Sequence, residues 1–437
     1  MRIGCSSAGA LCWLWLGTAV AQDVPHAFVG ARIEPIDAPA IERGTLLVQG
    51  GRIVAVGPVA DVKVPDDAVR VDAAGRTILP GLVDTHSHIG AVAGADASGP
   101  IQPEVRALDA VNPLDPGIQK AQAGGITTVN IMPGSGHLLS GQTIYCKLRD
   151  VRTVDELAIK NADGSIAGGI KMANGTNPQR EPPFAGTRGK SAALVRAQFA
   201  RAKEYQAKLA AAKDDPSKAP ERSLGLEALC EVLAGKRVVH FHTHRQDDIL
   251  TVLRLQQEFG FRCVLHHVSD GWLVAEQIAA AKVPCSVIVI DSPGGKLEAA
   301  HLSQTTGAVL DRAGALVGFH TDDGITDSRL FLRSAALAVR AGMDRTKALQ
   351  ALTIAGAKML DLQDRIGTLT PGKDADFVVL SGDPLSVYTR VLQTWVEGKK
   401  VFDLADPKDR TYANGGYGAS DDQAMSLCCF GTMLEGQ

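Results

Sequence analysis

The sequence predicts an α/β fold: a (β/α)8 TIM-type barrel with a small β-sandwich domain that is split between the two chain ends. Three observations predict it. Short apolar runs alternate with helix-like segments from residue 81 to residue 360. Strand-like runs joined by glycine turns precede and follow this region, at 27–80 and 361–403. Histidine or aspartate ends several of the central apolar runs, and barrels build their reactive sites at the carboxyl ends of strands.

The first 21 residues have the pattern of a signal peptide. Met1-Arg2 gives a short positive start, residues 8–20 are apolar, and Ala19-Val20-Ala21 has the small-x-small form of a cleavage site. The apolar run is shorter than the ~20 residues that a membrane span needs. We therefore expect export to the periplasm or the extracellular space, with no membrane span after signal cleavage.

The split β-domain is predicted from short runs on either side of the barrel. Residues 45–49 and 52–56 flank Gly50-Gly51, and a double glycine between two such runs is typical of a hairpin. Residues 377–380 and 391–396 return to strand character near the other chain end. The remaining tail, 404–437, is rich in Asp, Gly and Ser, and we expect it to be loose.

The barrel is predicted from the repeated order of strand and helix between these two segments. A barrel takes about 250 residues, which suits 81–360 better than an open sheet does. The candidate strands are 126–131, 238–241, 262–265, 285–290 and 315–319. The candidate helices are 192–213, 223–234, 246–258, 271–281 and 328–341. Residues 172–191 form an irregular insertion of the kind that often carries function.

Composition excludes several classes of function. The formal net charge of the 437 residues is -3, and no basic stripe is present, so the chain has no charge pattern for nucleic acid or for an anionic membrane. The eight cysteines include no CxxC pair, which argues against a zinc ribbon or a dense disulfide framework. We expect a small-molecule substrate, and the sequence leaves homo-oligomerisation open.

His86 and His88 are the first residues that indicate chemistry. They follow the apolar run that ends at Val83, and residues two apart on a strand point to the same face. Two imidazoles on one face can bind one metal ion. Such a pair is a weak signal alone, because most pairs of this kind are ordinary polar residues.

Three later strand ends strengthen the signal. His240, His242 and His244 alternate along one run, His266-His267 ends the next, and Asp322 follows the run at 315–319. Parallel strands bring these ends to one rim of a barrel. Imidazole and carboxylate ligands suit zinc or a similar divalent ion.

The run 79–88 resembles the opening of the amidohydrolase superfamily barrel. Residues 124–128 resemble its second-strand entry, and 367–380 resemble its closing Gly-x-x-x-x-Gly-x-x-Ala-Asp run. These motifs most resemble those of the secreted imidazolonepropionase- and prolidase-like branch of the superfamily. The resemblance implies a metal-dependent hydrolase with one or two zinc ions. It implies these ligands: His86, His88, His242, His267 and Asp322.

Lys171 occupies the place of the carboxylated lysine that bridges two metal ions in binuclear members of that superfamily. A carbamate has two oxygens that can span two cations, which a free ammonium cannot do. Without this modification, a mononuclear site is the alternative. Lys171 is therefore carried over as a metal ligand, and the number of metal ions depends on it.

Two ligand assignments involve a choice between neighbouring histidines. His242 matches the family spacing His-x-x-Arg-x-Asp, and His267 directly precedes the turn 268–271. The neighbours are then candidates for supporting the ligands or for contacting the substrate. Candidate substrate-binding residues are His244, Arg245, His320 and His137.

The expected reaction is hydrolysis of an amide, lactam or peptide-like C–N bond, including a dipeptidase-like activity. A metal-activated hydroxide attacks the carbonyl, Asp322 transfers the proton to the leaving nitrogen, and the strand-six His267 or a neighbouring pocket residue stabilises the oxyanion. A deaminase is one alternative, but superfamily deaminases carry a Glu just after the strand-five His, and Thr243 stands there. A metal-binding protein without turnover is the other alternative.

Overall fold

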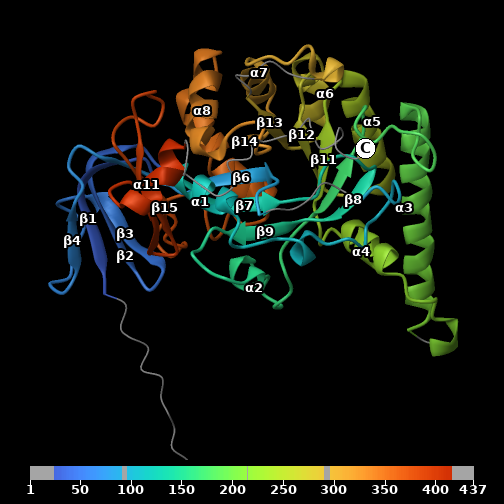
Figure 1. Ribbon diagram of the computed structural model, residues 1–437, viewed down its shortest axis with the longest axis horizontal. Helices are drawn as coiled ribbons and strands as arrows, with labels where there is room; N and C mark the ends of the chain where they lie inside the picture. Colours follow the sequence, from blue (N-terminus) through green and yellow to red (C-terminus); the bar gives the residue numbers. More distant parts are fainter. Residues whose placement is uncertain (1–23, 91–95, 214, 290–295, 416–437) are drawn as a thin grey trace, which may run out of the picture.

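The computed structural model describes residues 24–90, 96–213, 215–289 and 296–415. The predicted signal peptide, 1–21, lies outside these residues. Figure 1 shows a β-rich part that contains β1–β4 and β15, beside a larger part in which helices surround strands. Across the described ranges, no helix has both the length and the apolar character to cross a membrane.

The β-rich part combines strands from both chain ends in one eight-stranded sheet, in the order β17-β16-β15-β5-β1-β2-β3, with β4 on β1. The strands from the two chain ends pair antiparallel, since β15 runs opposite to β5. Phe377 on β15 lies opposite Pro80 on β5. These strands form one continuous ladder instead of the two separate sheets of a sandwich. The strands are β1 (His26–Ile33), β2 (Ile41–Gln49), β3 (Arg52–Pro58), β4 (Val69–Asp72), β5 (Thr77–Pro80), β15 (Phe377–Leu380), β16 (Val391–Val396) and β17 (Lys399–Asp403).

The turn between β2 and β3 is the predicted glycine hairpin. Gly50 and Gly51 have φ angles of 59° and 73°, in the left-handed region that glycine adopts without steric cost. The sheet encloses its own apolar cluster, in which the ring of Phe28 packs edge-on against Phe377 and Trp395, at centroid distances of 4.9 and 5.2 Å.

The central part has a TIM-barrel-like α/β fold, but its strands do not join in one closed ladder. They form a six-stranded sheet, β14-β13-β12-β11-β10-β8, and a three-stranded sheet, β6-β7-β9. The two sheets meet where the backbone N–H of Asp322, just after β14, donates to the carbonyl of His86 on β6, at 2.9 Å. The strands are β6 (Leu82–Ser87), β7 (Ile126–Ile131), β8 (Leu139–Gln142), β9 (Ile144–Lys147), β10 (Ile170–Ala173), β11 (Val239–Thr243), β12 (Cys263–His267), β13 (Cys285–Ile288) and β14 (Val317–His320).

The ladder departs from the expected uniform parallel barrel at β8 and β9. β8 runs antiparallel to β10, and β9 runs antiparallel to β7, so the segment after β7 adds one short antiparallel strand to each sheet. The remaining pairs from β10 to β14 are parallel. Their carboxyl ends therefore still meet at one rim, where polar side chains from different strands come together.

The helices follow the sequence pattern closely. α3 has a side-chain cap from Thr187, and α5 ends at Gly260 with a φ of 76°. The predicted loose tail begins instead with a helix, α11, which follows the cap residue Asp406. The α-helices are α1 (Pro116–Ala123), α2 (Val154–Leu157), α3 (Arg188–Ala211), α4 (Leu224–Leu233), α5 (Gln246–Phe259), α6 (Ala275–Ala280), α7 (Thr306–Arg312), α8 (Phe331–Arg340), α9 (Arg345–Ala351), α10 (Ile354–Met359) and α11 (Pro407–Asn414).

A buried ion-pair cluster joins the two parts. Lys147 at the end of β9 is fully buried, and its Nζ lies 2.9 Å from Asp374 and also contacts Asp376. Both aspartates belong to the segment that leads into β15. The cluster therefore ties the closing β-strands to the three-stranded sheet that carries His86.

Candidate metal centre

One group of ligand atoms gathers around the end of β6. The Nε2 atoms of His86 and His88 lie 3.3 Å apart, and they lie 3.3 and 3.0 Å from Oδ1 of Asp322. The other ring nitrogen of His88, Nδ1, donates to the carbonyl of Met132 at 2.8 Å, which fixes the orientation of the ring. Two imidazole nitrogens and one carboxylate oxygen that face the same point fit a divalent cation.

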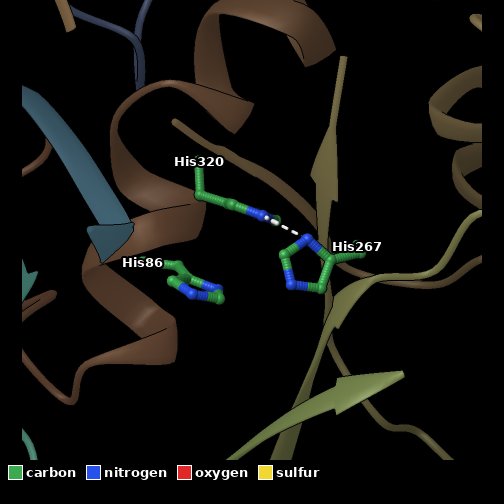
Figure 2. Close-up of side chains that lie close together, drawn as sticks. All are labelled: His86, His267 and His320. Atoms are coloured by element: carbon green, nitrogen blue, oxygen red, sulfur yellow. Dashed lines mark hydrogen bonds between the residues drawn. The ribbon is translucent and has the colours of Figure 1, made fainter. Parts of the chain in front are cut away.

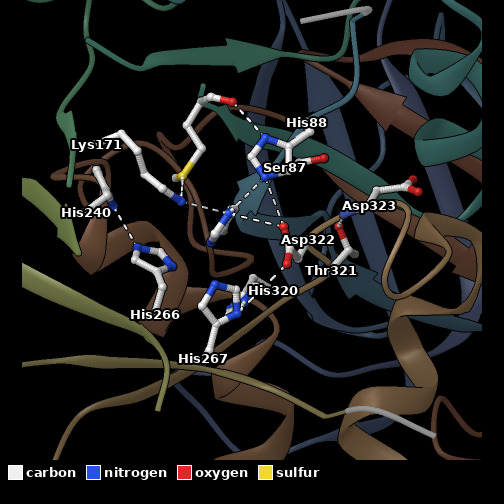
Figure 3. A network of polar contacts seen from close by, with 12 residues as sticks. Ser87, His88, Lys171, His240, His266, His267, His320, Thr321, Asp322 and Asp323 are labelled. Carbon is white, nitrogen blue, oxygen red and sulfur yellow. Dashed lines mark hydrogen bonds and ion pairs between the residues drawn. The ribbon is translucent and has the colours of Figure 1, made fainter. Parts of the chain in front are cut away.

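Lys171 approaches this group from β10. Its Nζ lies 3.0 Å from Nε2 of His86 and 3.1 Å from the sulfur of Met132. Figure 3 shows Lys171, His88 and Asp322 converging from three separate chain segments. Burial lowers the pKa of the Lys171 ammonium to about 7, against a weaker opposing effect of Asp322.

A second group of ligand atoms lies at the ends of β11 and β12. His242, His244 and His267 are buried, and one ring nitrogen from each lies within 4.8 Å of the other two. Neither nitrogen of His242 has a hydrogen-bond partner, and Nε2 is unpartnered in both His244 and His267. Three buried nitrogens with free lone pairs suit a cation, because an unsatisfied buried polar atom is costly.

His320 forms a third group of possible metal ligands with His86 and His267, and both of its ring nitrogens have contacts. Nδ1 contacts the hydroxyl of Ser286 at 2.8 Å, and Nε2 contacts Nδ1 of His267 at 3.1 Å (Figure 2). The Ser286 hydroxyl also contacts that of Thr85, at 2.6 Å. The contact with His320 therefore helps to fix the orientation of the His267 ring.

A family model described as the amidohydrolase family matches residues 77–403, which is more than half of the chain. The chain belongs to the amidohydrolase family. Membership confirms the resemblance seen in the sequence, and it sets the reaction class as hydrolysis at a C–N bond, including deamination. Members of this superfamily typically bind a divalent metal ion, which agrees with the clustered histidines.

Three amidohydrolase relatives are similar in sequence to this chain. The chain is 30% identical over 391 residues to amidohydrolase tasK of Hapsidospora irregularis, covering 82% of this chain but only 40% of that protein. It is 30% identical over 376 residues to imidazolonepropionase of Deinococcus radiodurans, covering 79% of this chain and 87% of that protein. The crystal structure of an amidohydrolase from Thermotoga maritima has 35% identity and a TM-score of 0.80, covering 86% of this chain and 99% of that chain.

The remaining candidate residues of this amidohydrolase belong to none of the groups of possible metal ligands. Arg245 pairs with Asp247 through two hydrogen bonds, of 3.0 and 2.9 Å, and the side chain is 40% exposed. The buried ring of His137 packs against Phe184, at a centroid distance of 5.3 Å. His137 and Arg245 thus stand outside both ligand groups.

The structure adds supporting residues that sequence reasoning missed. Asp84 is fully buried and accepts from the hydroxyl and the N–H of Thr321 and from the N–H of His86, at 2.6, 3.1 and 3.2 Å. It thus fixes the backbone on both sides of the first ligand group. Asp84 lies inside the same run as His86, but the sequence does not reveal that its partner is Thr321.

The backbone is unusual at the ligands themselves. His267, Val268 and Asp322 have φ angles of 71°, 53° and 50°. Left-handed backbone is uncommon for residues other than glycine, and such conformations cluster at functional sites. Here they turn His267 and Asp322 toward the other ligands at the strand ends.

Proposed function

We propose that this protein hydrolyses the C–N bond of a small amide, lactam or peptide-like molecule, with Asp322 as the proton-transferring group. The observation that carries the proposal is the position of the Asp322 carboxylate. Oδ1 lies beside the His86 and His88 nitrogens, and Oδ2 lies 4.0 Å from Nδ1 of His267. The carboxylate thus stands between the two ligand groups, where a substrate carbonyl and its leaving nitrogen must both be reached.

The ligand groups fit a centre of one or two zinc ions. His86, His88 and Asp322 would hold one ion, and His242 and His267 would hold the other, with Lys171 as a carbamate between them. When bound, the ions supply an activated water and polarise the scissile carbonyl. The surroundings of Lys171 support its assignment as the carbamate ligand. Its amine is buried, and its hydrogen-bond partners are an imidazole and a sulfur.

Each protein group then has a definite task. The Asp322 carboxylate accepts a proton from the attacking water and delivers it to the leaving nitrogen. Burial raises the pKa of Asp322, but the hydrogen bond and charge of His88 outweigh this effect and hold the pKa below its ordinary range. Asp322 is therefore ionised, the form that can accept a proton. Because Nδ1 of His267 contacts His320 and its other nitrogen is assigned to the cation, stabilising the oxyanion that develops on the carbonyl falls to a neighbouring pocket residue.

Deamination is the second reaction of this family, and a deaminase of Symbiobacterium thermophilum is 24% identical over 387 residues. Hydrolysis of an amide is favoured because Thr243 and His244 follow His242, so no glutamate stands next to it to protonate a leaving amine.

The test is a substrate panel with metal-loaded protein. N-acyl amino acids, dipeptides, cyclic amides and aminopurines are incubated, and released amine, opened ring and ammonia are measured separately. We expect amine release or ring opening, abolished in Asp322→Asn and retained in the exposed control Asp364→Asn. Ammonia from aminopurines alone would establish a deaminase. Stable metal binding with no turnover of any compound would establish a binding protein.

We also propose that residues 1–21 direct export, on the strength of their sequence pattern. The mass of the mature protein tests this: cleavage after Ala21 leaves Gln22 as the first residue, and an intact N-terminus would exclude it.

A further inference from the structure

The histidines of the metal centre differ in how many of their ring nitrogens are occupied. His240 uses both, with the Tyr145 hydroxyl at 2.8 Å and Nε2 of His266 at 3.0 Å. His320 also uses both. Both rings therefore have a contact at each nitrogen, although His320 also belongs to a group of possible metal ligands with His86 and His267. They form a buried polar layer inside the barrel.

His244 belongs to the opposite class. Its Nδ1 contacts the hydroxyl of Ser269 at 2.7 Å, while its Nε2 is buried and unpartnered. His267 repeats this arrangement, with Nδ1 on His320 and Nε2 free. His88 is likewise anchored through Nδ1, on the Met132 carbonyl. A ring anchored through one nitrogen while the other faces a shared point is the usual state of a metal-binding histidine.

His242, His244 and His267 also form one group of possible metal ligands, in which one ring nitrogen of each lies within 4.8 Å of one ring nitrogen of the others. A substrate-facing histidine needs no such neighbours. Imidazole nitrogen is a regular zinc ligand, so this group offers the second ion one imidazole beyond His242 and His267, in addition to the Lys171 carbamate of the proposed function.

We infer that His244 is the third imidazole ligand of the second cation, and that Ser269 positions it. The inference rests on the metal centre of the proposed function and extends its ligand set. The Ser269 hydroxyl accepts the Nδ1 proton of His244, which places the lone pair of His244 on Nε2, toward His242 and His267. Ser269 follows the left-handed residues His267 and Val268, so one turn after β12 supplies both a ligand and the support of another.

The test measures metal, independently of turnover. Protein stripped with a chelator is titrated with Zn²⁺ against a competing chelating dye, and bound zinc per chain is counted by mass spectrometry. We expect two ions in the wild-type chain. His244→Phe, which keeps a ring but no ligand, retains one and binds the second more than 100-fold less tightly. His301→Ala is the matched control, because His301 is 72% exposed.

Three further variants guard against misfolding. Ser269→Ala weakens the second ion about 10- to 100-fold, the range for a group that orients a ligand, and Ser269→Thr keeps it. In His244→Ala, added free imidazole restores the second ion, which a merely unfolded chain cannot do.

Two results overturn the inference. One is a wild-type chain that binds a single ion. The other is a His244→Phe chain that keeps both ions at full affinity while KM rises, which places His244 on the substrate. Both are distinct from failure of the proposed function, in which wild-type protein holds two ions and cleaves nothing in the substrate panel.

Discussion

Lys147 and Lys171 are both fully buried, but their amines have different kinds of partner. Lys147 has two carboxylates, Asp374 and Asp376. Lys171 contacts an imidazole nitrogen and a methionine sulfur. A buried charge is tolerated only with a partner, so the first lysine is a structural cation. The second is held where a neutral amine is favoured, and a neutral amine is the form that can be carboxylated.

The difference teaches how burial serves two purposes in one fold. In the Lys147 cluster, charge is balanced and the amine is unavailable. Around Lys171, the imidazole nitrogens are left open and the nearest carboxylate, that of Asp322, is turned to His86 and His88. The first region should set stability, and the second should set activity.

The largest effect is expected in the Lys171 region, at Asp322. Asp322→Asn removes the proton-accepting group, and we expect kcat to fall about 10²- to 10⁴-fold. The thermal midpoint should change little beside that loss. Steady-state kinetics and thermal melts check both. Full activity in Asp322→Asn would mean that another group transfers the proton.

Lys147→Met should do the reverse. It leaves the buried Asp376 without its cation, while Asp374 keeps Arg52 and Arg365, and we expect a loss of about 3–5 kcal/mol in the free energy of unfolding. Urea unfolding measures it, with the exposed Lys160→Met as control. Chains that remain folded should keep their metal and their activity per folded molecule. A stability equal to that of the control would break the comparison.

Lys171→Met sharpens the comparison from the other side. We expect one metal ion to bind on the order of 10- to 100-fold less tightly, with no loss of folding stability, because the amine has no carboxylate partner to leave behind. Protein prepared in ¹³C-bicarbonate should show a carbamate carbon signal. The signal should vanish in Lys171→Met and persist in Lys147→Met. An unchanged metal count in Lys171→Met would remove Lys171 from the centre.

The smallest effect is expected at the Ser286 hydroxyl. Ser286→Ala removes the hydroxyl between Thr85 and His320. We expect a loss of about 1 kcal/mol in the free energy of unfolding, the usual contribution of one hydrogen bond, and a smaller fall in activity than for Asp322→Asn. Restored stability and activity in Ser286→Thr would show that the hydroxyl is what matters.

The sequence predicted individual helices and strands better than it predicted how the strands join into sheets. The strand 126–131 and the hairpin at Gly50-Gly51 were found because they depend on local pattern. The antiparallel β8 and β9 and the helix α11 were missed, because tertiary contacts decide whether short or polar segments become ordered. The contacts of Lys147 with Asp374 and Asp376 span more than 200 residues, and no local signal announces them.

For the candidate site, the sequence predicted which side chains would gather. His86, His88, His242, His267 and Asp322 stand at strand ends, and parallel strands bring such ends together. The sequence could not say which ring nitrogen of each histidine is free. That depends on Ser269, Ser286 and Met132, which are ordinary residues until the fold places them. The role of His244 is visible only at that level.

The pairing of β5 with β15 has a consequence for how the protein is made. β5 ends at Pro80, and its neighbour β15 begins at Phe377, so most of the chain is synthesised between the two. Until then one edge of β5 is open, and an open strand edge invites aggregation. A chain that stops before Phe377 would thus keep an adhesive edge next to the strand bearing His86. Truncated products should be cleared or aggregate instead of persisting as a free barrel.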